Sequence, residues 1–496
     1  MGTEREVKLT VSPEFRLPRF ERLPDGVTVA PRPVERLQTV YLDTADLRLA
    51  RWGVSLRHRT GEGWTVKLPG ERVGPLLVRG EYLFPGEAKD PPGEALDLLR
   101  AYVRTASLRT AARLRSARRG VDVHDADGAG LAEVVYDEVS VLVGGRVEHR
   151  FREVEVEVFE GSSPEVLESL LSSLRATGAV TTAVPVSKYQ RAIGDRAAGP
   201  PEVTVPGLAR GTTAGEAVRR AISSSVVDLL RSDAVVRVDE EPEGVHQARV
   251  ATRRLRSDLR TFGPLLDEGW TLALREELRW LGDALGDTRD ADVLLDRLRR
   301  RSVRLPPDLA PGAEQVVRAL QRHDQETHAA LMDVYRSDRY VALLDRLVAA
   351  ANEPALSPEA DRPAADVLPA LVLRPWRRLA RDVGKAGRHP SDEQLHAIRI
   401  RTKRVRYAAE AVAPVAGKKA RRFARAAARL QGILGEHNDA IVAEAWLRGW
   451  AAGAGSRDAA FAAGVLAGIE RAAAAEARGP WRRAWRTLEN RKPTSW

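Results

Sequence analysis

The pattern of apolar and polar positions divides the chain into two parts. Between residues 3 and 193, apolar and polar side chains alternate in EREVKL, VSLRHR, WTVKL and FREVEVEV, and turn signals such as Pro69-Gly70 and Gly144-Gly145 separate these runs. Alternation with a period of two is typical of strands that bury one face. The first part is therefore predicted to form a mostly antiparallel sheet or barrel.

The second part is predicted to be almost purely helical. A segment rich in Gly, Pro and Ala, GDRAAGPPEVTVPGLARGTT from Gly194 to Thr213, precedes it and is typical of a linker. We expect a strand-rich domain at residues 3–195, a linker at 196–206 and a helical domain at 207–490. This organisation predicts an α+β multidomain protein.

An internal duplication organises the helical part. VHQARVATRRLR from Val245 is nearly repeated as LHAIRIRTKRVR from Leu395, and WLGDALGDTRDADVL from Trp280 is echoed by RLQGILGEHNDAIVA from Arg429. Two homologous units, at about residues 214–345 and 362–490, predict a pair of helical bundles related by an approximate two-fold axis. Their basic helices are then expected to meet at that axis.

Each of the two basic helices carries cations at steps of three and four residues, which places them on one face. These basic stripes are His246, Arg249, Arg253 and Arg256 in the first copy and His396, Arg399, Lys403 and Arg406 in the second. Apolar residues such as Leu255 and Val405 occupy the opposite face. Acidic residues are almost absent until Asp258 and Glu410, so like charges accumulate and favour an anionic partner. The competing interpretation is an ordinary solvated face.

The second repeated motif also contains charged residues. Asp287 and Asp290 of the first copy are matched by Glu436 and Asp439 of the second. We interpret these acids as structural groups that anchor the arginines or cap a turn, rather than as catalytic groups.

Composition limits the classes of partner. The 496 residues include 79 Lys and Arg against 69 Asp and Glu, a net charge of +10, which favours nucleic acid, anionic lipid or polyphosphate. Aromatic residues make up only 5%, and Tyr407 is the one aromatic in the basic helices, so a nucleic-acid partner is disfavoured. Without cysteine, a metal must be held by oxygen or nitrogen. No apolar run approaches the length of a membrane span, and we expect a cytoplasmic protein without a membrane partner.

Charge ladders mark the strand-rich part. Side chains that share one face of a strand include Glu4, Glu6 and Lys8; Arg57 and Arg59; Lys67; Arg79; and Glu153, Glu155 and Glu157. Adjacent carboxylates suit a divalent cation with hard oxygen ligands, Mg²⁺ or Mn²⁺. The Arg and Lys ladders suit phosphate oxygens. The competing interpretation is the wet face of a two-layer sheet with cross-strand ion pairs.

These residues resemble the CYTH family of triphosphate tunnel metalloenzymes, through the opening ExExK at Glu4, Glu6 and Lys8 and the SKYQR motif at residues 187–191. The resemblance implies an eight-stranded antiparallel tunnel that hydrolyses inorganic triphosphate, thiamine triphosphate or RNA 5′-triphosphate, or cyclises ATP. It implies catalysis by Glu4, Glu6 and Lys8. The implied metal ligands are Glu4, Glu6, Asp137 and the late glutamates Glu153, Glu155 and Glu157, and the resemblance leaves open which of these three ligate. The implied phosphate ligands are Lys8, Arg57, Arg59, Lys67 and Lys188. For a further tunnel arginine we prefer Arg115, with Arg118 as the alternative.

The helical part resembles a CHAD domain, through His246, His396 and the basic residues that follow them. This resemblance implies binding of inorganic polyphosphate between two helical bundles and an association with polyphosphate granules. The two histidines would add a pH-sensitive charge. We therefore expect metal-dependent hydrolysis of a triphosphate coupled to polyphosphate binding. A non-catalytic polyphosphate-binding protein is the alternative, and an adenylate cyclase or a nucleic-acid binder is less favoured.

Overall fold

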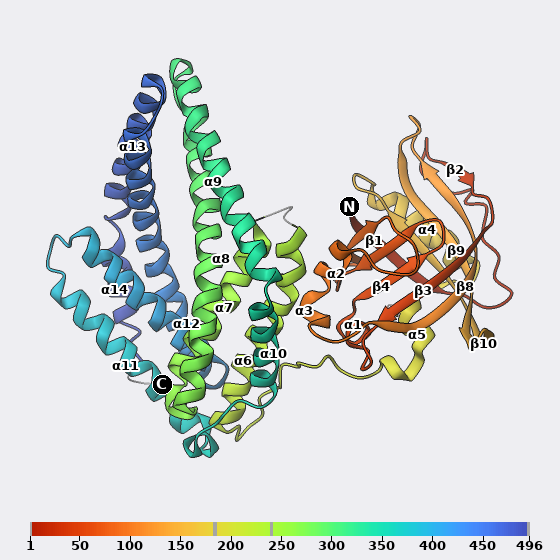
Figure 1. Cartoon of the computed structure of the whole chain (residues 1–496), viewed down its shortest axis with the longest axis horizontal. Coiled ribbons are helices and arrows are strands. Elements are labelled where there is room, and N and C mark those ends of the chain that lie inside the picture. The colour runs from red at the N-terminus through yellow and green to blue at the C-terminus, as the bar shows by residue number, and fades with distance from the viewer. Residues whose placement is uncertain (1, 182–185, 239–241, 494–496) are drawn as a thin grey trace. The chain divides into compact units, whose positions relative to one another are not determined.

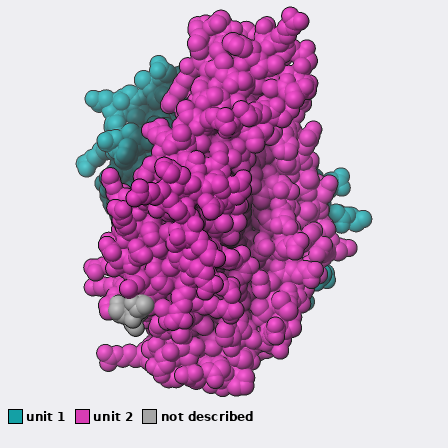
Figure 2. Space-filling view, turned by 90° about the vertical axis from the view of Figure 1, so that its left-hand side faces the viewer, with its two compact units in different colours: residues 1–202 teal, residues 203–496 magenta. Residues whose placement is uncertain are grey.

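The computed structural model describes residues 2–181, 186–238 and 242–493. The chain divides into two compact units, residues 1–202 and 203–496 (Figure 2). The first unit is rich in strands and the second is helical, as the cartoon in Figure 1 shows. The predicted α+β multidomain class is therefore confirmed.

Eight antiparallel strands of the first unit close into a barrel. In their order around the barrel they are β1 (Gly2–Thr10), β10 (Arg146–Val158), β9 (Gly130–Val143), β8 (Arg109–His124), β3 (Glu35–Asp43), β4 (Ser55–Arg59), β5 (Gly63–Lys67) and β7 (Leu76–Phe84). Pairing of β1 with both β10 and β7 closes the ring. Three short strands extend it: β2 (Thr28–Pro31) on β8, β6 (Glu71–Val73) on β7 and β11 (Val180–Thr181) on β1. The predicted eight-stranded barrel is confirmed.

Alternation along the strands separates an apolar outer face from an inner face that is charged around Glu155 and apolar around Tyr41 and Val139. Val154 and Val156 of β10 are fully buried in a core that includes Leu170 and Leu171 of helix α4 (Pro164–Ala176). The glutamates between these valines face the interior, because successive side chains of a strand point to opposite sides. The barrel interior is therefore lined by the ladders that the sequence displays.

A short helix, α5 (Lys188–Ile193), is held against the barrel by residues of the SKYQR motif. Ser187 and Gln190 form a capping box at its start. Tyr189 stacks on Tyr41 of β3 with 4.8 Å between ring centroids, and its hydroxyl donates to buried Asp43 at 2.8 Å. The SKYQR motif thus fixes the position of Lys188, the first residue of α5. Three further short helices, α1 (Arg48–Trp52), α2 (Gly93–Leu98) and α3 (Arg100–Val103), complete this unit.

The second unit contains two sets of helices in the same order. The first set is α6 (Ala214–Val238), α7 (Glu243–Thr261), α8 (Glu268–Ser302), α9 (Ala310–Arg336) and α10 (Asp338–Asn352); the second is α11 (Ala364–Lys385), α12 (Asp392–Ala452), α13 (Arg457–Ala477) and α14 (Trp481–Glu489). In the second set the equivalents of α7 and α8 form one helix with a kink at Gly417, whose φ is +74°. Pro264 and Pro414 occupy equivalent places near the two breaks.

The apolar faces of the basic helices are buried as predicted. Leu255 and Leu259 of α7 and Ile398 and Val405 of α12 are at most 1% exposed. Burial of these residues stabilises each helix and fixes which face its cations present to the rest of the unit. No helix in the described ranges is long and apolar enough to cross a membrane.

Candidate functional site

The strand register brings the predicted tunnel residues together inside the barrel. Glu4 lies opposite Arg79, and Lys8 opposite Glu155. Glu153 and Arg118 both lie opposite Asp137, on the two strands that flank β9. Opposite residues of paired strands share a face. One continuous interior surface therefore carries the carboxylates and the cations.

Around β1, the carboxylates are held by cations. Glu4 accepts from Lys67 at 2.6 Å and from Arg79 at 2.7 Å, and Arg79 also donates to Glu6 at 2.6 Å. Lys8 pairs with Glu6 at 3.3 Å and with Glu155. All of these groups except Glu155 are at most 9% exposed. Buried charges of this kind are stable only when they are paired, as here.

A second cluster lies where α5 meets the barrel. The ammonium group of Lys188 lies 3.0 Å from Asp137 and 2.9 Å from Glu153, and it also pairs with Glu155. Arg118 holds Asp137 through two hydrogen bonds of 3.0 and 2.8 Å. The bidentate geometry fixes this carboxylate more firmly than a single bond would.

The pairing decides which tunnel groups are charged. Burial raises the pKa of Glu4, but Lys67 and Arg79 outweigh it and lower this pKa to about 2. Lys188 and Arg118 likewise outweigh burial at Asp137 and lower its pKa to about 2. Glu157 differs, because burial and the charge of Glu4 raise its pKa to about 7. Glu157 therefore readily takes up a proton near neutral pH.

Cations gather on the neighbouring strands β4 and β5. Burial and the neighbouring Arg57 and Arg118 lower the pKa of Arg59, and burial with Arg79 and Arg57 lowers the pKa of Lys67. Mutual repulsion of this kind marks a region that a bound anion would stabilise. The interior is therefore polarised, with carboxylates mainly on β1, β9 and β10 and the mutually repelling cations Arg57, Arg59 and Lys67 on β4 and β5.

The structure separates the two arginines proposed for the tunnel. Arg118 shares the interior face with Asp137. Arg115 lies opposite Ser140 and Gln38, three residues before Arg118 on the same strand, so its side chain points to the other face, and it is exposed. The preferred candidate, Arg115, therefore faces away from the carboxylates. It lines an outer cavity of about 540 Å³ with Arg36 and Arg150.

Three residues that pair with interior groups were not predicted as site residues. Glu62 pairs with Arg59 at 2.9 Å, Glu81 pairs with Lys67 at 3.2 Å and Arg191 pairs with Glu153 at 2.8 Å. The alternation of Arg79 with Glu81 was a usable signal. Glu62 lies in the turn between β4 and β5, where strand alternation gives no information.

The donor set of the tunnel fits a divalent cation. Glu4, Glu6, Asp137, Glu153 and Glu155 supply only carboxylate oxygens, the ligands that Mg²⁺ and Mn²⁺ prefer. In the structure, each of these carboxylates is engaged by an ammonium or guanidinium group. A metal ion would therefore exchange with these cations rather than enter a preformed cage.

The two basic stripes of the helical unit converge. Burial, then Arg399 of its own helix and Arg253 and Arg249 of α7, lower the pKa of Lys403 to about 8. The guanidinium carbon of Arg253 lies 5.4 Å from the centroid of the Tyr407 ring of α12. Cations from the two copies are therefore close enough to repel one another, and they form one joint basic surface.

The repeated acidic motif anchors this surface. Arg249 donates to Asp290 at 2.8 Å, and the equivalent pair of Arg399 and Asp439 is 3.8 Å apart. A Cβ atom at Gly286 or at its equivalent Gly435 would lie 4.0 Å from these same two guanidinium groups. The predicted anchoring of the arginines is confirmed for Asp290 and Asp439. Glu436 instead pairs with Arg297 at 2.9 Å.

The remaining members of the stripes differ in their surroundings. Burial and nearby Arg289 lower the pKa of His246, so this imidazole is mainly neutral at neutral pH. His396 is exposed, and its Nδ1 lies 2.6 Å from Asn438. Arg406 donates to Glu410 at 2.7 Å, and burial lowers the pKa of Arg256. A neutral His246 would gain charge only beside an anion or at lower pH.

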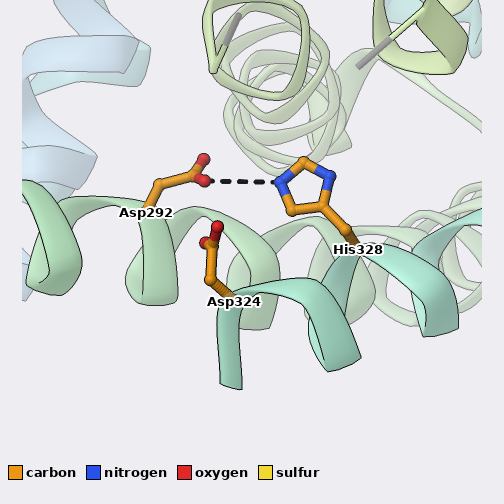
Figure 3. Close-up of side chains that lie close together, drawn as sticks. All are labelled: Asp292, Asp324 and His328. Atoms are coloured by element: carbon orange, nitrogen blue, oxygen red, sulfur yellow. Dashed lines mark hydrogen bonds and ion pairs between the residues drawn. The ribbon is translucent and has the colours of Figure 1, made fainter. Parts of the chain in front are cut away.

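A separate cluster joins α8 and α9. Asp292 lies on α8, Asp324 and His328 lie one turn apart on α9, and the three side chains point toward one another (Figure 3). His328 Nε2 lies 3.3 Å from Asp292, and one donor atom from each residue lies within 4.8 Å of the other two. Within the described ranges this is the one group of three or more such donors that converges so closely.

Comparison with known proteins agrees with the two architectures. Residues 2–179 match the model of the CYTH domain, and residues 220–448 match that of the CHAD domain. The chain belongs to the proteins in which an N-terminal CYTH domain precedes a C-terminal CHAD domain. CYTH domains form a family that acts on triphosphates and typically depends on divalent metal.

Two kinds of relative accompany these domain matches. The chain is 34% identical over 467 residues to the uncharacterized protein Rv2226 of Mycobacterium tuberculosis, a match that covers 88% of this chain and 87% of the relative. Among solved structures it is similar to the CHAD domain from the plant Ricinus communis, with 26% identity, a TM-score of 0.48 and coverage of 58% of this chain and 95% of that one. It is also similar to PptA from Streptomyces chartreusis, with 24% identity, a TM-score of 0.47 and coverage of 55% and 100%.

Proposed function

We propose that the barrel is a metal-dependent triphosphatase and that the helical unit binds inorganic polyphosphate. The single observation that carries the catalytic half is the polarised interior of the barrel. Carboxylates that suit a divalent cation share one enclosed surface with cations that repel one another. A phosphate chain between the two groups would satisfy both.

In this proposal the interior residues divide the work. Glu4, Glu6, Asp137, Glu153 and Glu155 would hold Mg²⁺ or Mn²⁺, which supplies Lewis-acid polarisation of a phosphoryl oxygen when bound. Arg57, Arg59, Lys67, Arg79 and Arg118 would hold the chain, together with Lys8 and Lys188. Water attacks the terminal phosphorus, the bridging P–O bond breaks, and diphosphate leaves with its charge offset by these cations. Glu157 is the weakest candidate ligand, because its pKa near 7 keeps it partly protonated.

Inorganic triphosphate is the substrate we favour. The interior residues around Glu4 and Lys188 are charged, and an inorganic chain needs only cations and metal. A nucleoside or thiamine group would need apolar contacts as well. The helical unit would further favour inorganic chains, because a tethered binding module raises their local concentration near the barrel.

Polyphosphate binding by the helical unit rests on the convergence of the two stripes. Lys403 lies among Arg249, Arg253 and Arg399, and burial together with these arginines lowers its pKa to about 8. A linear polyanion would replace this repulsion with attraction along both helices. Association with polyphosphate granules in the cytoplasm would follow from such binding.

The decisive assay measures phosphate release from tripolyphosphate, ATP and thiamine triphosphate with Mg²⁺ or Mn²⁺. We expect Glu4→Gln with Glu6→Gln to lower turnover at least 100-fold while polyphosphate binding is retained. Glu21→Gln with Glu71→Gln, which alters two exposed glutamates of the same unit, is the matched control. Equal turnover in the two double variants would refute the metal assignment. Formation of cyclic AMP instead of phosphate would identify a cyclase.

A second candidate is a protein that captures phosphate chains without hydrolysing them. The observation that favours it is that Lys67, Lys8 and Lys188 already occupy the carboxylates. In that case tripolyphosphate would bind in the barrel, and no substrate would be turned over with either metal. Calorimetry with tripolyphosphate, run beside the release assay, separates the two functions.

A further inference from the structure

The duplication places two pockets at equivalent positions of the helical unit. One cavity, of about 260 Å³, lies between α6, α7 and α12 and is lined by Arg220, Arg254 and Pro414 among others. The other, of about 400 Å³, lies between α11, α12 and α7 and is lined by Ala370, Arg404 and Pro264. Arg220 corresponds to Ala370, Arg254 to Arg404 and Pro414 to Pro264, and the residue numbers of each pair differ by 150. The two pockets are therefore copies of one ancestral site.

The charges of the two copies have diverged. Asp228, which lies 3.8 Å from Arg254 of the first pocket, is replaced by Arg378 in the second. Glu410 of the first pocket corresponds to Arg260, and Ser224 corresponds to Arg374. Acidic or neutral residues have thus become arginines at three equivalent positions. We name the second cavity the arginine pocket, after Arg260, Arg374, Arg378, Arg401 and Arg404.

Most of these arginines lack a compensating carboxylate. Arg401 pairs with Asp382 at 3.0 Å. In the described part of the chain, no ion pair within 4.0 Å joins an acid to Arg260, Arg374, Arg378 or Arg404. Burial and the nearby charges of Arg404, Arg275 and Arg256 also lower the pKa of Arg260 to about 10. The uncompensated cations repel one another, so an anion is the natural occupant.

Much of the wall of the arginine pocket is apolar. Pro264, Ala370, Leu371 and Pro375 line it beside the arginines, together with Ser257 and Thr261. An inorganic phosphate chain would gain nothing from this wall, whereas a planar or apolar body would bury surface against it. Guanidinium groups also hold phosphate oxygens in pairs and stack on aromatic rings.

We propose that the arginine pocket binds an organic phosphate, a compound that joins two or more phosphoryl groups to a compact ring. The pocket belongs to the helical unit and not to the barrel. Its residues on α11 and α12, including Arg374, Arg401 and Arg404, are not members of either basic stripe. The inference goes beyond the proposed function and does not depend on it. Arg256 of the first stripe lies one helical turn before Arg260, so an inorganic chain is the rival source of phosphate oxygens.

Arginine footprinting on the full-length protein tests the proposal. Phenylglyoxal modification is followed by mass spectrometry in EDTA, so that the barrel cannot turn over the probe. Arg374 and Arg378 are exposed and accessible to the reagent. We expect ATP to slow their modification at least fivefold, adenosine to have no effect, and tripolyphosphate to protect less than ATP. No protection by ATP, or equal protection by tripolyphosphate at the same phosphate concentration, would overturn the proposal.

A charge-inverted variant provides the matched comparison. Arg260→Glu with Arg378→Asp installs the residues of the first pocket and should abolish ATP protection of Arg374. Arg421→Asp with Arg425→Glu makes the same charge change at two exposed positions of α12 and should leave that protection intact. Loss of protection in both variants would mean that ATP protection depends only on the net charge of the protein, which would refute the site. If the inverted variant fails to fold, Arg374→Ala with protection read at Arg378 replaces it.

Discussion

Arg253 of α7 and Tyr407 of α12 connect the two copies of the helical repeat, with 5.4 Å between the guanidinium carbon and the ring centroid. Arg406 lies over the same ring at 5.5 Å. One buried aromatic side chain therefore holds a cation from each stripe where the basic helices approach. The relationship is asymmetric, because the residue equivalent to Tyr407 in the first copy is Ser257.

The first prediction concerns this aromatic junction. Tyr407→Ala should lower the free energy of unfolding by about 3 kcal/mol, because it removes a buried ring from the core. It should also weaken polyphosphate binding, since Arg253 and Arg406 lose the surface that orders them. Tyr407→Phe keeps the ring and should retain binding. Urea unfolding and polyphosphate titration measure the two effects, and equal binding by both variants would show that the ring does not order the cations.

The second prediction concerns the anchored arginines. Arg249→Ala with Arg399→Ala should weaken polyphosphate binding and reduce the slope of log affinity against log salt by about 1.4, at about 0.7 for each lost phosphate contact on a flexible chain. Affinity is measured at several salt concentrations. Arg300→Ala with Arg318→Ala is the control, because these exposed arginines also pair with nearby acids, at 2.8 and 2.6 Å. An equal loss of slope in the control would mean that the stripes are not the binding surface.

The opposite change should strengthen binding. Asp290→Asn with Asp439→Asn removes the two negative charges that compete for Arg249 and Arg399. Tighter polyphosphate binding is expected, with a steeper salt dependence. Weaker binding would instead mean that the acids act mainly by orienting the guanidinium groups.

The third prediction concerns pH. Burial and the neighbouring arginines lower the pKa of Lys403 to about 8, so this lysine loses its charge between pH 7 and pH 9. A bound polyanion would raise the pKa again, and binding therefore takes up a proton at high pH. Affinity should fall about tenfold from pH 7 to pH 9, since one pKa unit is a factor of ten in equilibrium. Lys403→Arg should bind with much less pH dependence; a parallel decline would exclude Lys403 as the titrating group.

The fourth prediction concerns the buried carboxyl group of the first pocket. Burial raises the pKa of Asp258 from 3.8 to about 8, against the opposing effect of Arg254. The folded state thus binds more protons than the unfolded state between these pH values, and the free energy of unfolding falls as pH rises from about 4 to 8. Asp258→Asn should reduce the fall between pH 5 and pH 8 by at least about 1.4 kcal/mol, the value of one pKa unit.

Denaturant unfolding at these two pH values measures that difference. Asp296→Asn, at an exposed position of α8, is the control and should follow the wild type. Parallel pH curves for the wild type and Asp258→Asn would show that Asp258 is ionised in the folded protein.

The sequence predicted features that depend on local periodicity. Steps of three and four fixed the members of both stripes, and alternation fixed the inward face of Glu153 and Glu155. The sequence did not predict the arginine pocket, because Arg260 and Arg374 belong to helices that meet only after α11 packs against α12. The sequence also displayed Glu4 and Lys67 as separate candidates, whereas their mutual ion pair depends on closure of the barrel through β1 and β7.

The same limit explains the choice between Arg115 and Arg118, and it yields the fifth prediction. Arginines occur on both faces of β8, so alternation alone cannot identify the one that points inward. The register with β9 places Arg118 against Asp137, and Arg115 faces outward. In the proposed triphosphatase, Arg118→Ala should lower kcat/KM for tripolyphosphate at least 100-fold, because it removes a phosphate contact and releases Asp137. Arg115→Ala should remain within twofold of wild type. Steady-state phosphate release measures both variants, and a larger loss for Arg115→Ala would refute the assignment.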